Sequence, residues 1–160
     1  MIESTTEHAA KILIERCANM GLTLGTAESV TGGLVSGALT AVPGSSGVFR
    51  GGVVAYSNDV KHRVLHVSKE LIAQGVVTRE VTLQMAKGIR TLMGVDVGLA
   101  CSGVAGPGAD RGVLQGTVWI ACSTSKDQHA ELLKLEGNRD QVRSETVARL
   151  IQSAFTFLDK

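Results

Sequence analysis

The stretch LTLGTAESVTGG, residues 22–33, joins a half-apolar run to a turn and then to an apolar-periodic segment. This order predicts a β-strand, a tight turn and the N-terminus of an α-helix. Ser29 falls at the turn, beside the first free N–H groups of the helix, and Gly32 and Gly33 let a ligand approach the backbone. A helix N-terminus favours an anion or a developing oxyanion. The stretch predicts either a nucleophile elbow built on Ser29 or, with equal weight, a plain strand-to-helix turn capped by Thr31.

Length and composition indicate one globular domain. The chain has 160 residues, of which 44% are hydrophobic and 19% charged, and its net charge is +1. This size can bury a substantial core, so we expect a single domain over residues 1–160. The near-zero charge and the 3% of aromatic residues argue against nucleic acid or an anionic membrane as the partner. The sequence shows no basic-then-apolar leader and no membrane-spanning apolar run, so we expect a cytoplasmic protein.

The cysteines and histidines do not form a recognisable metal or disulfide pattern. Cys17, Cys101 and Cys122 are far apart and lie in apolar runs, which predicts buried free thiols. His62 and His66 have i,i+4 spacing, but no acid or cysteine cluster accompanies them. We therefore expect neither a metal nor a cofactor.

The other segments alternate between helical and strand patterns. Helix caps are predicted at Ser4, Ser57, Thr78 and Asn138, and a further short helix over residues 68–74. Strands are predicted over residues 48–57, 95–102, 117–123 and 130–136, the first with a bulge at its Gly-Gly pair. This order predicts an α/β fold, a three-layer α/β/α sandwich with a mixed, mostly parallel sheet.

Several polar residues follow predicted strands, where α/β folds bind their ligands. Ser29, Tyr56 and Ser102 all occupy such positions, so they can share one crevice. The glycine-rich loop over residues 103–108 suggests either a phosphate nest or a simple tight turn. Arg139, with a second arginine four residues later, can reach a phosphate or carboxylate or can be an ordinary surface residue.

A serine nucleophile needs a base, and two residues are candidates. His62 lacks an obvious carboxylate to orient it. Lys61 is the better candidate because it follows a strand end, provided that burial lowers its pKa from ~10.4; otherwise it is a solvated surface lysine. Glu28 should point to the opposite face from Ser29 if strand alternation persists.

Six motifs together resemble the C-terminal domain family of the competence/damage-inducible protein CinA. They are TAESVTGG at 26–33, GSS at 44–46, GGVVAYSN at 51–58 with Lys61, SGVAGPG at 102–108, GTVW at 116–119 and GNR at 137–139. They stand in the family's order and cover essentially the whole chain. The resemblance implies a nicotinamide-nucleotide amidase, which hydrolyses the carboxamide of nicotinamide mononucleotide (NMN) to nicotinate mononucleotide and ammonia.

The resemblance also implies roles for individual residues. Ser29 would be the nucleophile, Lys61 its base and Tyr56 a helper that carries a proton or positions the lysine. We expect the substrate-binding groups to be Thr31, Gly32, Gly33, Ser102, Gly103, Ala105, Gly106 and Arg139. N–H groups near the first three would hold the oxyanion. The expected partner is a small-molecule nucleotide, and the expected assembly is a homodimer.

The chain departs from the family pattern at two places. Val30 replaces a common cysteine, and residues 109–115, ADRGVLQ, form a shorter loop without the usual proline and lysine. The shortened loop leaves open an alternative function, a catalytically silent module that binds a nucleotide or a protein linked to competence or DNA damage. The intact set of Ser29, Tyr56 and Lys61 favours the enzyme.

Overall fold

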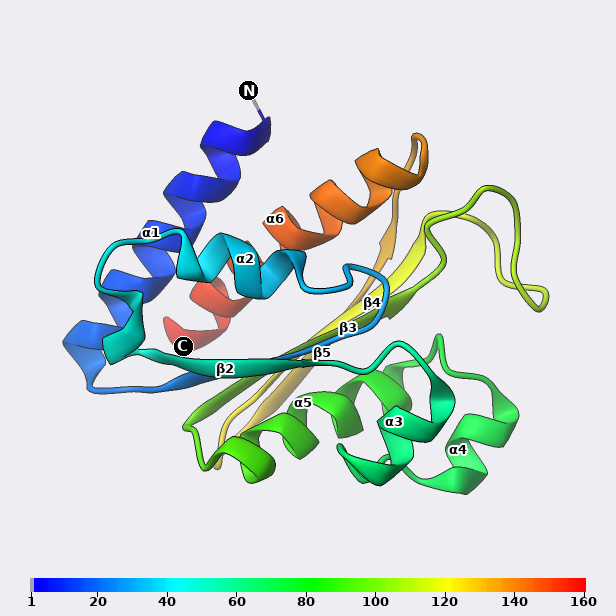
Figure 1. Ribbon diagram of the computed structural model, residues 1–160, viewed down its shortest axis with the longest axis horizontal. Coiled ribbons are helices and arrows are strands. Elements are labelled where there is room, and N and C mark those ends of the chain that lie inside the picture. Colours follow the sequence, from blue (N-terminus) through cyan, green and yellow to red (C-terminus); the bar gives the residue numbers. More distant parts are fainter. Residues whose placement is uncertain (1) are drawn as a thin grey trace.

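Five strands form one mixed sheet in the order β2-β1-β3-β4-β5 (Figure 1). The computed structural model describes residues 2–160 of the chain, with side chains from Thr5 onward. The strands are β1 (Leu24–Glu28), β2 (Phe49–Val54), β3 (Val97–Gly103), β4 (Thr117–Ser123) and β5 (Gln128–Lys134). β1 is parallel to β2 and β3, whereas β4 is antiparallel to β3 and β5. The mixed sheet is confirmed, although parallel and antiparallel pairings are equal in number where a mostly parallel sheet was predicted.

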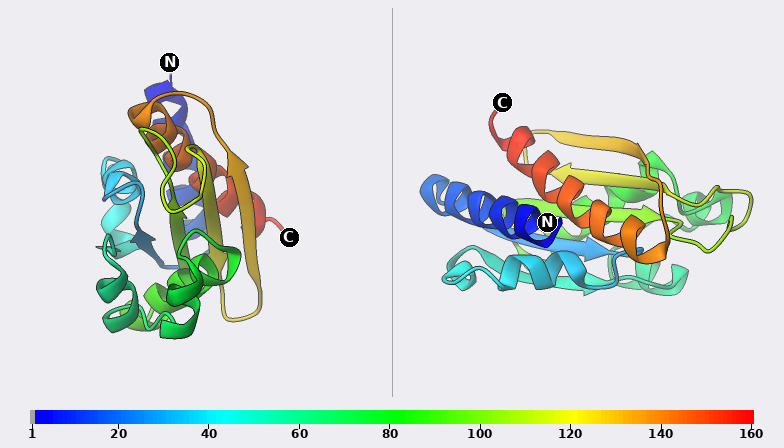
Figure 2. Two further views of the ribbon diagram at one scale, coloured as in Figure 1. Left: turned by 90° about the vertical axis from the view of Figure 1, so that its right-hand side faces the viewer. Right: turned by 90° about the horizontal axis from the view of Figure 1, so that it is seen from above.

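Helices cover both faces of the sheet and complete the predicted three-layer sandwich (Figures 1 and 2). One face carries α1 (Ile2–Met20), α2 (Leu34–Thr40) and α6 (Arg139–Leu158). The other carries α3 (Asn58–Arg63), α4 (Lys69–Gln74) and α5 (Arg79–Met93). A single 3-10 turn, η1 (Ser45–Gly47), precedes β2. None of the described helices has the length and apolar character needed to cross a bilayer.

Each face of the sheet has its own apolar core. Leu13, Leu39 and Leu150 belong to the core beneath α1, α2 and α6, while Met85 and Ile89 of α5 belong to the other. α5 approaches β3 so closely that a Cβ built on Gly98 would lie 2.0 Å from the Ala86 carbonyl oxygen. All three cysteines are buried and free, as predicted.

Capping residues place most helix starts where the sequence predicts them. Thr78 Oγ1 accepts a 3.2 Å hydrogen bond from the Val81 N–H at the start of α5. Asn138 begins α6 with a complete capping box. The predicted cap at Ser4 is wrong, because α1 already begins at Ile2 and no residue between them breaks the helix.

The strand boundaries differ from prediction by two or three residues at three strands. β2 ends at Val54 rather than at residue 57, and β3 begins at Val97 rather than at residue 95. The third difference is a shift of β5 by two residues toward the N-terminus. This strand begins two residues earlier than expected, because the Thr124 N–H donates to the Asp127 carbonyl (2.9 Å) and closes the turn at that point. In β2 the predicted bulge is present, since Leu24 pairs with Phe49 but Gly25 pairs with Gly51.

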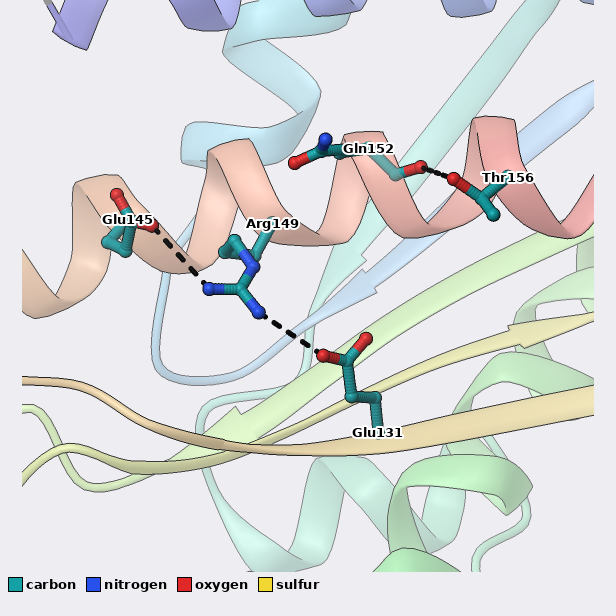
Figure 3. A network of polar contacts seen from close by, with 5 residues as sticks. All are labelled: Glu131, Glu145, Arg149, Gln152 and Thr156. Atoms are coloured by element: carbon teal, nitrogen blue, oxygen red, sulfur yellow. Dashed lines mark hydrogen bonds and ion pairs between the residues drawn. The ribbon is translucent and has the colours of Figure 1, made fainter.

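Polar contacts join the edge strand β5 to the helix that covers it (Figure 3). Arg149 of α6 lies 3.3 Å from Glu131 of β5 and 3.9 Å from Glu145 one turn earlier. Farther along the helix, Thr156 Oγ1 donates to the Gln152 carbonyl at 3.1 Å. Ion pairs this exposed contribute at most about 1 kcal/mol each, so the apolar cores supply most of the stability.

Candidate active site

Ser29 occupies a tight turn between β1 and α2. Its N–H donates to the Cys101 carbonyl of β3 at 3.2 Å, and its carbonyl accepts from the Gly32 N–H at 3.1 Å. The backbone of Ser29 is therefore fixed on both sides. Its hydroxyl points to the face of the sheet on which α3 lies, where it meets Lys61.

Glu28, the residue before Ser29, caps α2 from the opposite face. Its side chain is 1% exposed. One carboxylate oxygen accepts from Thr31 Oγ1 (2.6 Å), the Gly33 N–H (3.2 Å) and the Val35 N–H (2.8 Å). The other accepts from the N–H and the hydroxyl of Ser36 at 2.9 and 2.8 Å. The carboxylate thus replaces the N-cap side chain that Gly33 cannot supply.

Arg143 of α6 fixes the same turn from a distant part of the chain. Its Nε donates to the Val30 carbonyl at 3.2 Å and its guanidinium NH2 group to the Thr31 carbonyl at 3.1 Å. This arginine was weighed above as a phosphate ligand. In the structure it holds the backbone that follows Ser29.

Lys61 is the side chain that meets the Ser29 hydroxyl. Its Nζ lies 3.0 Å from Ser29 Oγ and 2.8 Å from the carbonyl oxygen of Ala55. The residue is only 1% exposed, and burial lowers the pKa of its amine from 10.5 to about 8. Removing an ammonium from water without a paired carboxylate favours the neutral amine. Lys61 is therefore suited to accept a proton near neutral pH.

A short, well-capped helix delivers Lys61 to this position. Ser57 Oγ accepts from the Val60 N–H at the start of α3, as predicted. At the other end the Lys61 carbonyl accepts from the Val67 N–H at 3.1 Å. The backbone of Lys61 is thus fixed on both sides.

A cavity of about 680 Å³ opens above Ser29 and Lys61, at the carboxyl ends of β1, β2 and β3. Eight of the predicted site residues line it: Ser29, Tyr56, Lys61, Ser102, Gly103, Ala105, Gly106 and Arg139. The single crevice predicted from the strand ends is therefore present. Other lining residues were not among the predicted site residues, including Val30, Asn58, Val76, Val77, and Asp110 and Arg111 of the shortened loop.

Three predicted site residues do not reach the cavity. Thr31 is fully buried, and its hydroxyl forms hydrogen bonds with the carboxylate of Glu28 and the thiol of Cys101. The N–H groups of Gly32 and Gly33 already donate to Ser29 and Glu28. The expectation that these residues hold the oxyanion is wrong, because their donors already have acceptors within the fold: the Thr31 hydroxyl and the Gly33 N–H donate to Glu28, and the Gly32 N–H donates to the Ser29 carbonyl.

The N–H of Val30 is a better-placed donor for an oxyanion. Val30 lines the cavity directly after Ser29. Its N–H has no acceptor among the residues that the structure describes. A donor on the residue after the nucleophile is the arrangement of a nucleophile elbow.

Tyr56 and Arg139 form a pair at the rim of the cavity. The Tyr56 ring is 63% exposed, and its hydroxyl accepts from Arg139 at 3.2 Å. Arg139 also donates to the Gly106 carbonyl at 2.7 Å, so it links the glycine-rich loop to the tyrosine. Among the described residues Tyr56 makes no hydrogen bond to Ser29 or Lys61, so its role as a helper stays a prediction.

His62 is not placed to act as the base. Its Nδ1 hydrogen-bonds the Val67 carbonyl at 2.8 Å, and the residue does not line the cavity. Within the described part of the chain, no group of three or more acidic, cysteine or histidine residues is placed to ligate a metal.

The fold and the site define an α/β protein in which a half-buried serine meets a buried lysine beneath one cavity. Residues 6–158 match the family model described as CinA C-terminal domain. The chain belongs to this family. It is 44% identical over 138 residues to the CinA-like protein of Gemmatimonas aurantiaca. The aligned region covers 84% of this chain and 32% of that protein. The chain thus spans about a third of the length of that relative.

Relatives of similar length and solved structures agree with this assignment. The Protein MG115 homolog of Mycoplasma pneumoniae is 38% identical over 146 residues, covering 90% of this chain and 93% of that protein. The crystal structure of competence/damage inducible protein CihA from Agrobacterium tumefaciens matches with a TM-score of 0.92 at 32% identity, over 98% of this chain and 96% of that one. The competence damage-inducible protein A from Klebsiella pneumoniae gives 0.94 at 29% identity, over 96% and 97%.

Replacing the buried Glu28 carboxylate should destabilise the protein and loosen the turn between β1 and α2 that carries Ser29. We expect Glu28→Gln to lower the free energy of unfolding by about 2–4 kcal/mol, because the amide NH2 group would face N–H donors. Urea denaturation measures the loss, and the exposed Glu136→Gln is the matched control, with a change within about 0.5 kcal/mol. Equal stability of both variants would show that the cap is dispensable.

Burial of Lys61 should cost stability in a pH-dependent way. Its pKa of about 8 lies below the ordinary 10.5. Burying the ammonium therefore lowers the free energy of unfolding by the full amount below pH 8, where the amine is charged in both the folded and the unfolded state. The loss shrinks between pH 8 and 10.5 and vanishes above that range. At pH 7 the shift corresponds to roughly 3 kcal/mol. We expect Lys61→Met to raise the free energy of unfolding by about 1–3 kcal/mol at pH 7, less any hydrogen-bond loss, and by less at pH 10. Denaturation at both pH values measures this; a gain that is independent of pH would contradict it.

Proposed function

We propose that this chain is an amidase that hydrolyses the carboxamide of NMN to nicotinate mononucleotide and ammonia by a Ser–Lys mechanism. The observation that carries the proposal is the 3.0 Å separation of Lys61 Nζ and Ser29 Oγ. The low pKa of Lys61 and the adjoining cavity add support. A cavity of about 680 Å³ falls within the usual range for small-molecule sites. The resemblance to the CinA family supplies the substrate.

Acylation would begin with proton transfer from Ser29 to neutral Lys61. One N–H of the amine donates to the Ala55 carbonyl, which orients the nitrogen lone pair toward the serine hydroxyl. As the proton moves to Nζ, Oγ forms a bond to the carboxamide carbon. The negative charge that develops on the carbonyl oxygen is within reach of the Val30 N–H.

Breakdown of this tetrahedral intermediate returns the proton. Protonated Lys61 donates it to the departing nitrogen as the C–N bond breaks, and ammonia leaves an ester on Ser29. Water then attacks the ester while Lys61 takes its proton and passes it to Oγ. The products are a carboxylic acid, ammonia and the free serine, and the acid then gives its proton to ammonia or to water, which leaves the carboxylate of nicotinate mononucleotide.

The homodimer and the absence of nucleic-acid and membrane partners remain predictions from the sequence. A catalytically silent module is the rival function. It would retain the cavity and bind a nucleotide without turnover. The buried lysine favours the enzyme, because a module that only binds a nucleotide has no use for an amine whose pKa is lowered toward neutral pH.

Removing the nucleophile should abolish turnover without unfolding the protein. We expect purified protein to release ammonia from NMN and Ser29→Ala to lose at least roughly 10³-fold in kcat. Ser125→Ala, in the exposed β4–β5 turn, is the matched control and should keep wild-type turnover. Unchanged turnover in Ser29→Ala would exclude this nucleophile. A wild-type protein that binds NMN in a thermal-shift assay but releases no ammonia would favour the silent module.

The pH dependence should report the deprotonation of Lys61. We expect kcat/KM to rise with pH and level off above about 8, where the amine is neutral. Lys61→Met should lower kcat by about 10²–10⁴-fold, and Lys61→Arg should be as poor because a guanidinium keeps its proton. Lys126→Met is the control, since Lys126 lies in the exposed β4–β5 turn. Wild-type turnover and an unchanged pH profile in Lys61→Arg would place the base elsewhere.

A further inference from the structure

Arg111 lies at the tip of the loop between β3 and β4, in an unusual backbone conformation. Its φ is +46° and that of the following Gly112 is +80°. Asp110 and Val113 exchange two backbone hydrogen bonds, of 3.0 and 2.8 Å. Arg111 and Gly112 are therefore the central pair of a type I′ hairpin turn, a position that favours asparagine, aspartate or glycine over arginine.

In the described part of the chain, the other non-glycine residue with positive φ has a structural reason for it. His66, with φ of +58°, follows α3. Its N–H donates to the His62 carbonyl and the next N–H donates to the Lys61 carbonyl, which is the pattern of a helix C-cap. The turn at Arg111 would form more easily with asparagine. The requirement that keeps arginine there is therefore not the turn itself.

The arginine side chain extends the positive charge of the cavity to its rim. Arg111 and Arg139 both line the cavity, and Asp110 is the acidic side chain among the lining residues. Arg139 is engaged by Gly106 and Tyr56. The Arg111 guanidinium, by contrast, has no hydrogen bond or ion pair with any described residue. Its donors are free for a ligand.

We propose that Arg111 binds the phosphate monoester of the nucleotide substrate and so selects nucleotide over nucleoside; this rests on the proposed function. The reacting carboxamide must reach Lys61, which is buried, while Arg111 lines the same cavity as an exposed residue. A guanidinium matches two phosphate oxygens with parallel hydrogen bonds. The unfavourable φ is maintained because it directs this side chain over the cavity.

The decisive variant is Arg111→Asn, which removes the charge and creates the Asn-Gly pair that a type I′ turn prefers. We expect the ratio of kcat/KM for NMN to that for nicotinamide riboside to fall about tenfold, as for loss of one charge-assisted hydrogen bond. The melting temperature of the unliganded protein should rise by about 2 °C. Arg111→Lys keeps the positive charge and the unfavourable positive φ. It should retain part of the preference for NMN over nicotinamide riboside and should not raise the melting temperature.

Arg50→Gln is the matched control, because Arg50 is an exposed arginine at the start of β2, at the opposite end of the sheet. It should leave the substrate ratio unchanged. An unchanged ratio in Arg111→Asn overturns the proposal while leaving the amidase intact.

A binding assay separates this inference from the proposed function. Ribose 5-phosphate, but not ribose, should raise the melting temperature of the wild type, and Arg111→Asn should lose that shift. If the wild type releases no ammonia, the amidase fails, yet loss of the ribose 5-phosphate shift in the variant still supports phosphate recognition. A shift of equal size in both proteins overturns it.

Discussion

The buried carboxylate of Glu28 is the constraint on which the site depends. Burying an ionised group is costly unless hydrogen bonds replace its hydration, and here five donors from one turn and one helix end do so. Those donors are fixed only when α2 begins at Leu34. Because successive side chains on β1 alternate between faces, placing Glu28 toward α2 places Ser29 toward α3. The arrangement that lets Glu28 cap α2 therefore also directs the Ser29 hydroxyl toward α3.

Two hydrogen bonds of Ala55 connect the backbone of Glu28 to the side chain of Lys61. The Ala55 N–H donates to the Glu28 carbonyl at 2.7 Å, and the Ala55 carbonyl accepts from Lys61 Nζ at 2.8 Å. One residue at the end of β2 thus links the chain before the serine to the amine beside it. The separation of Ser29 and Lys61 is set by parallel pairing of β1 and β2 rather than by the two side chains alone.

The sequence predicted the features that local chemistry determines. Caps at Thr78 and Asn138, the strand over 117–123 and the shared crevice at the strand ends all follow from nearby residues. The sequence did not reveal which N–H groups the fold itself uses. The Thr31–Gly33 donors were expected to face a ligand, but a carboxylate only a few residues earlier takes the Gly33 N–H.

Long-range contacts account for most of what the sequence analysis missed. Arg143 lies 112 residues from the Thr31 carbonyl it binds, and no local pattern indicates that pairing. One available signal was overlooked. A glutamate at the end of a strand buried along its whole length must find donors, and a helix beginning without a capping side chain supplies them.

Features that folding alone does not favour gather around one cavity. An amine is buried without a carboxylate partner at Lys61, and an arginine adopts a left-handed conformation at Arg111. Burial of the amine and the left-handed φ of the arginine each lower stability. Selection for stability alone would replace both, with an apolar residue in one case and asparagine or glycine in the other. Both lie in a single cavity, beside a serine whose N–H and carbonyl are both hydrogen-bonded, and their occurrence together supports the proposed reaction better than the requirements of the sandwich explain it.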